Sequence, residues 1–172
     1  AHVEGMVDGI YEPTADHLEL IGDETSVMGR LLDDLQLLSN AEAGARRLHR
    51  DRLEPRELLD SAETTFRAQA GEAGVRLVVH AEEGLPVVDV DPIRIGEVVA
   101  NLVSNALRHT PSGGTITIAA VRVGDDVAFS VTDTGEGIPA DELAHVFVRF
   151  ARSAESRGSG LGLAIAKSLV EA

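Results

Sequence analysis

Residues 131–139 read V-T-D-T-G-E-G-I-P and combine one carboxylate with two closely spaced glycines. Because side chains alternate along a strand, Phe129, Val131 and Asp133 are predicted to share one face. The two apolar members indicate the buried face, so we expect Asp133 at the inner edge of an apolar layer. A buried carboxylate without a donor is costly. Either the amides of the following turn or an N–H group of a ligand must therefore meet it.

The two glycines of this stretch, Gly135 and Gly137, bear on that choice. A glycine lets the backbone approach a flat ligand closely, where a side chain would block it. Ile138 follows and is expected to cover a ring of that ligand. The stretch therefore favours a ligand over a simple turn, without identifying the ligand.

A second polar pattern lies on a helix predicted over residues 91–109. Asn101, Asn105, Arg108 and His109 stand at i, i+4, i+7 and i+8, which places them on one stripe. Asparagine is a poor helix former, because its amide competes for backbone hydrogen bonds. The stripe is either a solvated face or a row of oxygen ligands and cationic donors for Mg²⁺ and phosphate. One Asn carbonyl fits the preference of Mg²⁺ for few protein oxygens completed by water and phosphate.

A third pattern is R-G-S-G-L-G-L-A-I at residues 157–165. Three glycines precede an amphipathic helix, whose first amides are free to bind an anion. The spacing is neither that of a dinucleotide-binding fold nor that of a P-loop. By itself this motif does not identify a ligand.

The elements that must position these residues alternate between helices and strands. Asp91-Pro92 is a typical helix start, with Asp as N-cap and Pro at the first helical position. Strands over 113–123 and 127–133 are joined by a hairpin turn at 124–126. We predict an α+β fold: a helical hairpin followed by a two-layer α/β sandwich with one mixed sheet. Further helices are predicted at 55–73, from 139 to about 144 and at 160–171, strands at 47–53, 76–81 and 86–90, and a polar loop at 151–159.

Each long helix of the predicted sandwich shows an apolar face at steps of three and four. In the helix over 55–73 this face comprises Leu58, Leu59, Ala62 and Phe66. In the helix over 91–109 it comprises Ile95, Val98, Val99, Leu102, Ala106 and Leu107.

The first part of the chain is predicted to be a helical hairpin over residues 1–44, with the sandwich over 45–172. Thr14 or Asp16 is able to cap a long helix that runs to about Glu42 and ends near Gly44. The apolar heptad seam of this helix is wider than the seam of a two-helix coiled coil. This width indicates a four-helix bundle made with a second copy of the chain. The alternative is that the seam packs on the rest of this chain. The seam comprises Leu18, Ile21, Met28, Leu32 and Leu35, widened by Leu31 and Leu38.

The composition excludes several classes of protein. The chain has 172 residues and no cysteine, so disulfides and thiolate metal sites are excluded. A formal charge of −14 argues against nucleic acid or an anionic membrane surface as the main partner. No apolar run approaches the length of about 18 residues typical of a membrane span, and no signal-peptide pattern occurs.

Taken together and in this order, the motifs resemble those of the sensor histidine kinases of two-component systems. The stretch 101–106 resembles their N box, 133–138 the first glycine box, 147–150 the F box and 158–163 the second glycine box. The preceding hairpin resembles their dimerisation and histidine-phosphotransfer region. The resemblance covers essentially the whole chain. It implies the Bergerat-type ATP-binding fold shared with gyrase, MutL and heat-shock chaperones.

The resemblance implies ATP and Mg²⁺ as cofactors. Asp133 is expected to accept a hydrogen bond from the adenine amino group. Asn105 is expected to ligate Mg²⁺, with Asn101 assisting and Arg108 reaching the phosphates; these three are the expected catalytic residues. Residues 151–159 would form a lid over the nucleotide. The other residues expected around ATP are His109, Gly135, Gly137, Ile138, Arg149, Phe150, Arg152, Gly158, Ser159, Gly160, Leu161 and Gly162.

The family's phosphoacceptor is a His followed by an acidic residue, with Pro five positions on, and no His of this chain fits. We therefore expect the acceptor upstream of residue 1, and a catalytic fragment that cannot autophosphorylate alone. The family's C-terminal β-hairpin is also expected to be missing. The implied partners are a second copy through the helical hairpin and a response regulator, not nucleic acid. The implied location is the cytoplasmic part of a membrane-anchored bacterial sensor.

Three other functions share parts of these patterns. Hydrolytic ATPases of the gyrase, MutL and chaperone type place a Glu four residues before the Mg²⁺-binding Asn, where this chain has Asn101, which is no base. An anti-sigma-type serine kinase shares the fold but lacks the heptad hairpin. A non-enzymatic dimeric scaffold would not need Asn105, Asp133 and both glycine motifs intact.

Overall fold

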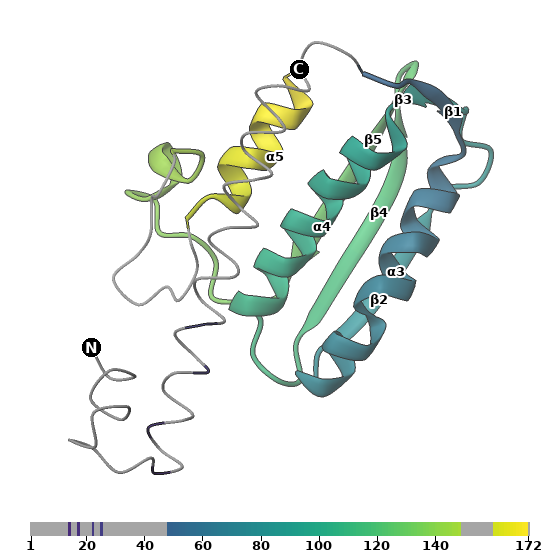
Figure 1. Ribbon diagram of the computed structural model, residues 1–172. Coiled ribbons are helices and arrows are strands. Elements are labelled where there is room, and N and C mark those ends of the chain that lie inside the picture. The colour runs from purple at the N-terminus through teal and green to yellow at the C-terminus, as the bar shows by residue number, and fades with distance from the viewer. Residues whose placement is uncertain are drawn as a thin grey trace.

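The computed structural model describes residues 48–148 and 160–171, together with Thr14, His17, Gly22 and Thr25 (Figure 1). Helices and strands alternate through the two continuous ranges. Their order is β1 (Asp51–Leu53), α3 (Pro55–Glu72), β2 (Arg76–Ala81), β3 (Val88–Val90), α4 (Pro92–His109), β4 (Thr115–Val123), β5 (Asp126–Asp133), the 3-10 helix η1 (Leu143–His145) and α5 (Gly162–Val170).

The main sheet is mixed, as predicted. Its order is β2-β4-β5, with β2 parallel to β4 and β4 antiparallel to β5. The strands β1 and β3 form a separate antiparallel pair. The turn between β4 and β5 is shorter than predicted: Asp126 already pairs with Val123, so it belongs to β5. Gly124 has a φ of +65°, the conformation that such a tight turn requires.

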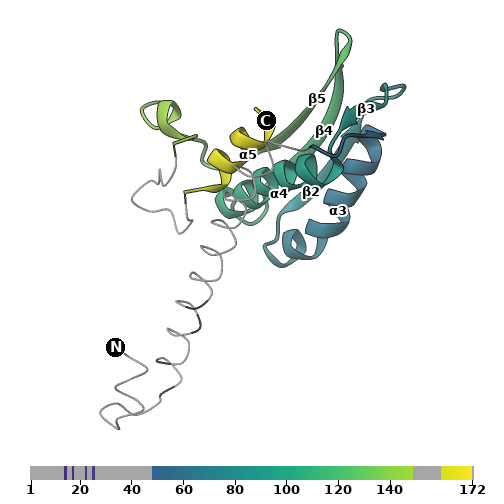
Figure 2. The same ribbon diagram turned by 45° about the horizontal axis from the view of Figure 1, so that its top comes forward.

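The helices form one layer against the sheet. Figure 1 shows α4 between α3 and α5, and Figure 2 shows all three on the same side of the strands. The core lies between these layers and includes Leu59, Ile116 and Ile118, each at most 1% exposed. Side chains of β4 alternate between this core and the opposite face. The predicted two-layer sandwich is therefore confirmed.

Helix α4 begins as the sequence predicts. Asp91 Oδ1 accepts hydrogen bonds from the backbone N–H groups of Ile93 at 3.1 Å and Arg94 at 3.2 Å. Pro92 occupies the first helical position. An N-cap of this kind satisfies amides that have no partner inside the helix.

The apolar face of α4 is divided between two neighbours. Val99 and Val103 belong to the core beneath the sheet, whereas Val98 is buried against α5. Ile95 and Leu102 are only half-buried and pack against the α5 cluster, and Val103, which the predicted face omits, is fully buried. All six predicted residues pack in or against one of the two clusters, so the predicted face is confirmed; it lacked only Val103, and it is shared between the sheet and α5.

The segment after Pro139 does not form the predicted helix. The N–H groups of Glu142 and Leu143 both donate to Pro139 O, at 3.0 and 3.1 Å, and only the 3-10 helix η1 follows. Leu143 is 53% exposed and η1 contains no buried residue. A short helix gains most of its stability from packing, and this segment has no buried apolar face.

The predicted helical hairpin lies almost entirely outside the described residues, as do its apolar seam and the loop over 151–159. Within the hairpin, His17, Gly22 and Thr25 are helical, and His17 N–H donates to Thr14 Oγ1 at 3.4 Å. This is the cap predicted for Thr14. The domain boundary and the dimer remain predictions. None of the helices that the structure describes is long and apolar enough to cross a bilayer.

Candidate functional site

Asp133 ends β5 and pairs with Ile116 of β4. Phe129 and Val131 pack against the core, so the predicted shared face is confirmed. The carboxylate itself is exposed, and the expected burial is wrong. Asp133 is the last residue of β5, which is the edge strand of the sheet, and it lies beyond Phe129 and Val131, which pack against the core. Asp133 therefore stands at an opening rather than inside the apolar layer.

The two carboxylate oxygens of Asp133 differ in their hydrogen bonding. Oδ1 accepts a hydrogen bond from Gly135 N–H at 2.8 Å, which is the turn contact that the sequence left open. Oδ2 has no hydrogen-bond partner among the described residues. The carboxylate is thus held in one orientation by the turn and still presents an acceptor to solvent.

Gly135 makes a close packing contact that the sequence did not predict. A Cβ atom there would collide with the backbone carbonyl oxygen of His109 and lie 2.8 Å from Asp133 Oδ1. The glycine therefore allows the turn to rest on the end of α4. At Gly137 no atom lies within 4 Å of the Cβ position, but its φ of +74° favours glycine.

A pocket of about 480 Å³ opens where this turn meets the end of α4. That volume falls within the range of about 300–1,000 Å³ typical of small-molecule sites. Of the expected residues, it brings together Arg108, His109 and Gly135; Asp133, Gly137 and Ile138 are close in sequence but do not line it. Its lining comprises Arg108, His109, Thr110, Pro111, Thr134, Gly135 and Glu136.

Sequence reasoning missed four residues that line this pocket, Thr110, Pro111, Thr134 and Glu136, and the last two connect its turn to neighbouring elements. Thr134 joins the turn to β4: its N–H donates to Thr115 O at 3.1 Å, and its Oγ1 accepts from Thr115 N–H at 2.9 Å. Glu136 reaches back to α4, where its Oε1 lies 3.3 Å from His109 Nδ1. Thr134 and Glu136 both lie inside the motif D-T-G-E-G, which is the sequence signal that could have identified them.

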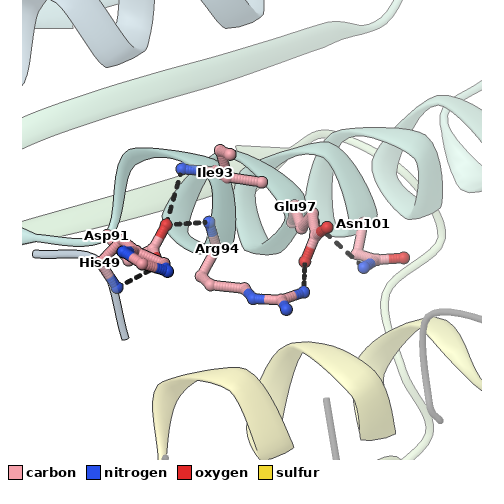
Figure 3. Close-up of polar contacts among 6 residues, drawn as sticks. All are labelled: His49, Asp91, Ile93, Arg94, Glu97 and Asn101. Atoms are coloured by element: carbon pink, nitrogen blue, oxygen red, sulfur yellow. Dashed lines mark hydrogen bonds and ion pairs between the residues drawn. The ribbon is translucent and has the colours of Figure 1, made fainter. Parts of the chain in front are cut away.

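The polar row on α4 is not a solvated face. Asn101 and Asn105 are half-buried, and only Arg108 is exposed. The Nδ2 group of Asn101 donates to Glu97 O at 3.0 Å (Figure 3). On the same side of α4, Arg94 Nη1 lies 3.0 Å from Glu97 Oε2. These side chains lie on the side of α4 that faces α5.

The second glycine motif meets this row. Helix α5 begins at Gly162 without a side-chain cap, after Gly160 with a φ of +71° and a fully buried Leu161. A Cβ atom on Gly162 would lie 3.4 Å from Asn101 Oδ1. The first amides of α5 have no acceptor within the helix, so the polar row of α4 adjoins a favourable anion-binding terminus.

The remaining expected ATP contacts cannot be placed in this geometry. They lie outside the described residues, and they are Arg149, Phe150, Arg152, Gly158 and Ser159. Ile138 is 45% exposed, so its side chain is accessible to a ligand.

Asp91 connects α4 to the segment before β1. Its Oδ1 caps the helix, and its Oδ2 accepts from His49 N–H at 2.9 Å (Figure 3). Desolvation raises the pKa of Asp91, but the hydrogen bonds from His49, Arg94 and Ile93 and the charge of Arg94 outweigh it and leave the pKa lowered. The cap was predicted from sequence, and the link to His49 was not.

Comparison with known proteins places these features in one family. A family described as histidine kinase-, DNA gyrase B- and HSP90-like ATPase matches residues 90–172. The sensor protein DivL of Caulobacter vibrioides is 35% identical over 164 residues, which is 95% of this chain and 21% of DivL. This chain thus spans only a minor part of the length of the curated relatives that it matches.

Two solved structures resemble the fold. The mycobacterial sensor histidine kinase MprB is 31% identical with a TM-score of 0.61, over 71% of this chain and 78% of that one. The histidine kinase AdeS of Acinetobacter baumannii has a TM-score of 0.75 over 99% of this chain and 80% of its own. At 23% identity, the likeness to AdeS supports the fold alone.

Proposed function

Because this chain belongs to the sensor histidine kinases within the histidine kinase-, DNA gyrase B- and HSP90-like ATPases, we propose that its site binds ATP with Mg²⁺. We further propose that the protein it represents is an autophosphorylating protein-histidine kinase. The observation that carries the proposal is the contact between the Asn row of α4 and the glycine-rich start of α5, with Gly162 beside Asn101. A phosphate chain needs oxygen ligands and backbone amides together.

Asp133 is the proposed adenine contact. Gly135 N–H donates a hydrogen bond to one carboxylate oxygen and fixes its position, and the other oxygen accepts a hydrogen bond from the amino group of adenine. Such a charge-assisted hydrogen bond contributes about 1.5–3 kcal/mol. The pocket beside it, lined by His109 and Thr134, receives the rest of the base or the ribose.

The phosphate end is proposed to lie between Asn105, Arg108 and the start of α5. The donor set fits Mg²⁺, because a single amide oxygen leaves most coordination positions to water and phosphate. When bound, the ion neutralises phosphate charge. The protein itself carries a formal charge of −14, so local cations such as Arg108 are needed to bind an anionic nucleotide. Arg149 and Arg152 are proposed to add to them.

Phosphoryl transfer by this arrangement is mainly a matter of positioning. We propose that an imidazole nitrogen of a histidine forms a bond to the γ-phosphorus while the bond to the β–γ bridging oxygen breaks and ADP leaves. The phosphoryl group then passes to an aspartate of a response regulator. The acceptor histidine is proposed to lie on a dimerisation helix upstream of residue 1, in a homodimer formed through the helical hairpin.

The decisive experiment uses a longer protein that extends upstream of residue 1, incubated with ATP labelled at the γ-phosphate. Label that is stable in alkali, labile in acid and located on a histidine supports the kinase function. The Asn105→Ala variant should lose this label. Steady ATP hydrolysis without a phosphoprotein would instead support a hydrolytic ATPase, and neither label nor hydrolysis would overturn both.

A further inference from the structure

Glu136 stands between the two glycines of the turn after β5 and reaches the last residue of α4. Its Oε1 lies 3.3 Å from His109 Nδ1, and both residues line the pocket of about 480 Å³. We propose that Glu136 is a positioning residue that makes His109 an acceptor for a ribose hydroxyl, so that the site favours nucleotides that carry the sugar hydroxyls. This inference rests on the proposed nucleotide site and assigns the part of the nucleotide that meets the pocket.

The contact with Glu136 determines which nitrogen of the His109 ring carries the proton. An ionised carboxylate accepts hydrogen bonds and cannot donate them, so the contact requires a proton on Nδ1. In the neutral imidazole, Nε2 then keeps its lone pair. This nitrogen has no hydrogen-bond partner among the residues that the structure describes. It is therefore an available acceptor on a half-buried side chain that lines the pocket.

The turn that carries Glu136 is fixed by contacts that do not involve its side chain. Gly135 packs against the backbone carbonyl oxygen of His109, and Thr134 forms hydrogen bonds to β4 through its N–H and its Oγ1. The orientation of Asp133 depends on Gly135 N–H. The side chain of Glu136 is exposed. Its removal should therefore release the His109 ring without displacing Asp133.

The chemistry of ADP makes the ribose the best match for this pair of side chains. Adenine offers hydrogen-bond donors only through its amino group, which is proposed to bind Asp133. The diphosphate is anionic, so the carboxylate of Glu136 disfavours it at this position. The two ribose hydroxyls are neutral donors. They match two acceptors at the pocket, His109 Nε2 and the second carboxylate oxygen of Glu136.

The test compares the affinities of ADP and 2′,3′-dideoxy-ADP by isothermal titration calorimetry. The two nucleotides share the base and the diphosphate, so the ratio of their dissociation constants reports on the sugar hydroxyls. We expect the unaltered chain to prefer ADP about tenfold, as the loss of hydrogen bonds predicts. Glu136→Ala should lose most of this preference. The matched control is Glu83→Ala, which removes an exposed carboxylate outside the pocket and should keep the preference.

A second measurement reads the His109 ring without a ligand. Nitrogen-15 NMR of the imidazole at pH 8, where unperturbed histidines are neutral, distinguishes the two tautomers. We expect the proton on Nδ1 in the unaltered chain and a shift towards the Nε2-protonated form in Glu136→Ala. A role of Glu136 in the stability of the turn alone would not change the tautomer.

Three results would each overturn the inference and leave the proposed function intact. They are equal affinity of the unaltered chain for ADP and 2′,3′-dideoxy-ADP, an undiminished preference in Glu136→Ala, and a His109 ring that carries its proton on Nε2. If the unaltered chain binds neither nucleotide, the proposed function falls together with this inference.

Discussion

At the scale of single residues, Asp133, the proposed adenine contact, is oriented by the turn that follows it. Its Oδ1 is occupied by Gly135 N–H, and its Oδ2 is open. The turn itself packs against the backbone of His109, and this close approach is possible because Gly135 has no side chain. The acceptor is therefore fixed before a ligand arrives, which reduces the entropy that binding must overcome.

We predict that Asp133→Asn weakens ADP binding about 10- to 100-fold, the loss expected for a charge-assisted hydrogen bond. An Asn at this position would keep its oxygen on Gly135 N–H and turn its amino group towards the amino group of adenine. Isothermal titration calorimetry measures the change. The matched control is Asp126→Asn, an exposed carboxylate at the other end of β5. Equal affinity in both variants would mean that Asp133 does not contact the nucleotide.

At the scale of elements, α4 is the centre of the molecule. It packs on the sheet through Val99 and Val103, on α5 through Val98, and it carries the polar row of the site. Its first turn is held by Asp91, which also binds His49 N–H and thereby ties the segment before β1 to the helix. Loss of the Asp91 carboxylate therefore affects both the helix cap and the hydrogen bond to His49.

This double role predicts a pH dependence. The pKa of Asp91 is lower in the folded protein than the value of about 3.9 for an unfolded Asp. Its ionised form therefore stabilises the fold fully above about pH 4, and this contribution is lost as the pH falls through the lowered pKa. Asn caps a helix as well as Asp, but its amino group cannot accept from His49 N–H.

Urea unfolding should accordingly show a lower midpoint for Asp91→Asn than for the unaltered protein at pH 7. The difference should shrink below about pH 4, where the carboxylate becomes protonated. Asp89→Asn, which alters an exposed carboxylate of the neighbouring strand β3, provides the control. A difference that stays constant from pH 7 to pH 2 would contradict the assigned role.

At the scale of the whole molecule, the site joins parts that are distant along the chain. The end of β5 in the sheet layer, and α4 and the start of α5 in the helix layer, come from separate stretches of the chain (Figure 1). A nucleotide bound across them should stabilise the whole fold, because it binds the folded chain and not the unfolded one.

With ADP and Mg²⁺ at a hundred times the dissociation constant, stabilisation should be about 2.7 kcal/mol. For a chain of this size that corresponds to a rise in melting temperature of about 5–10 °C. Differential scanning calorimetry measures it, and inorganic tripolyphosphate, which lacks the base and sugar, should give a smaller rise at the same concentration. An equal rise would indicate anion binding without recognition of adenine.

Much of this architecture could be predicted from local patterns. Asp91-Pro92 predicts where α4 begins, the period of two predicts β4 and β5, and the order of the glycine and Asn motifs indicates the family. These features depend on neighbours along the chain, through caps, turns and the side on which each residue falls. Such short-range effects are readable without knowing what packs against the element.

What covers each face was decided only by the tertiary structure. Asp133 shares the predicted face with Val131 but is exposed, because it ends the edge strand β5 beyond the residues that pack against the core. Leu102 packs against the cluster formed with α5, and Val103, which the predicted face omitted, is fully buried. The contact that favours glycine at position 135 is made with His109, and the Asn101 amide is oriented by its hydrogen bond to Glu97 O. Periodicity assigns a residue to a face, but only packing determines the partner that the face meets.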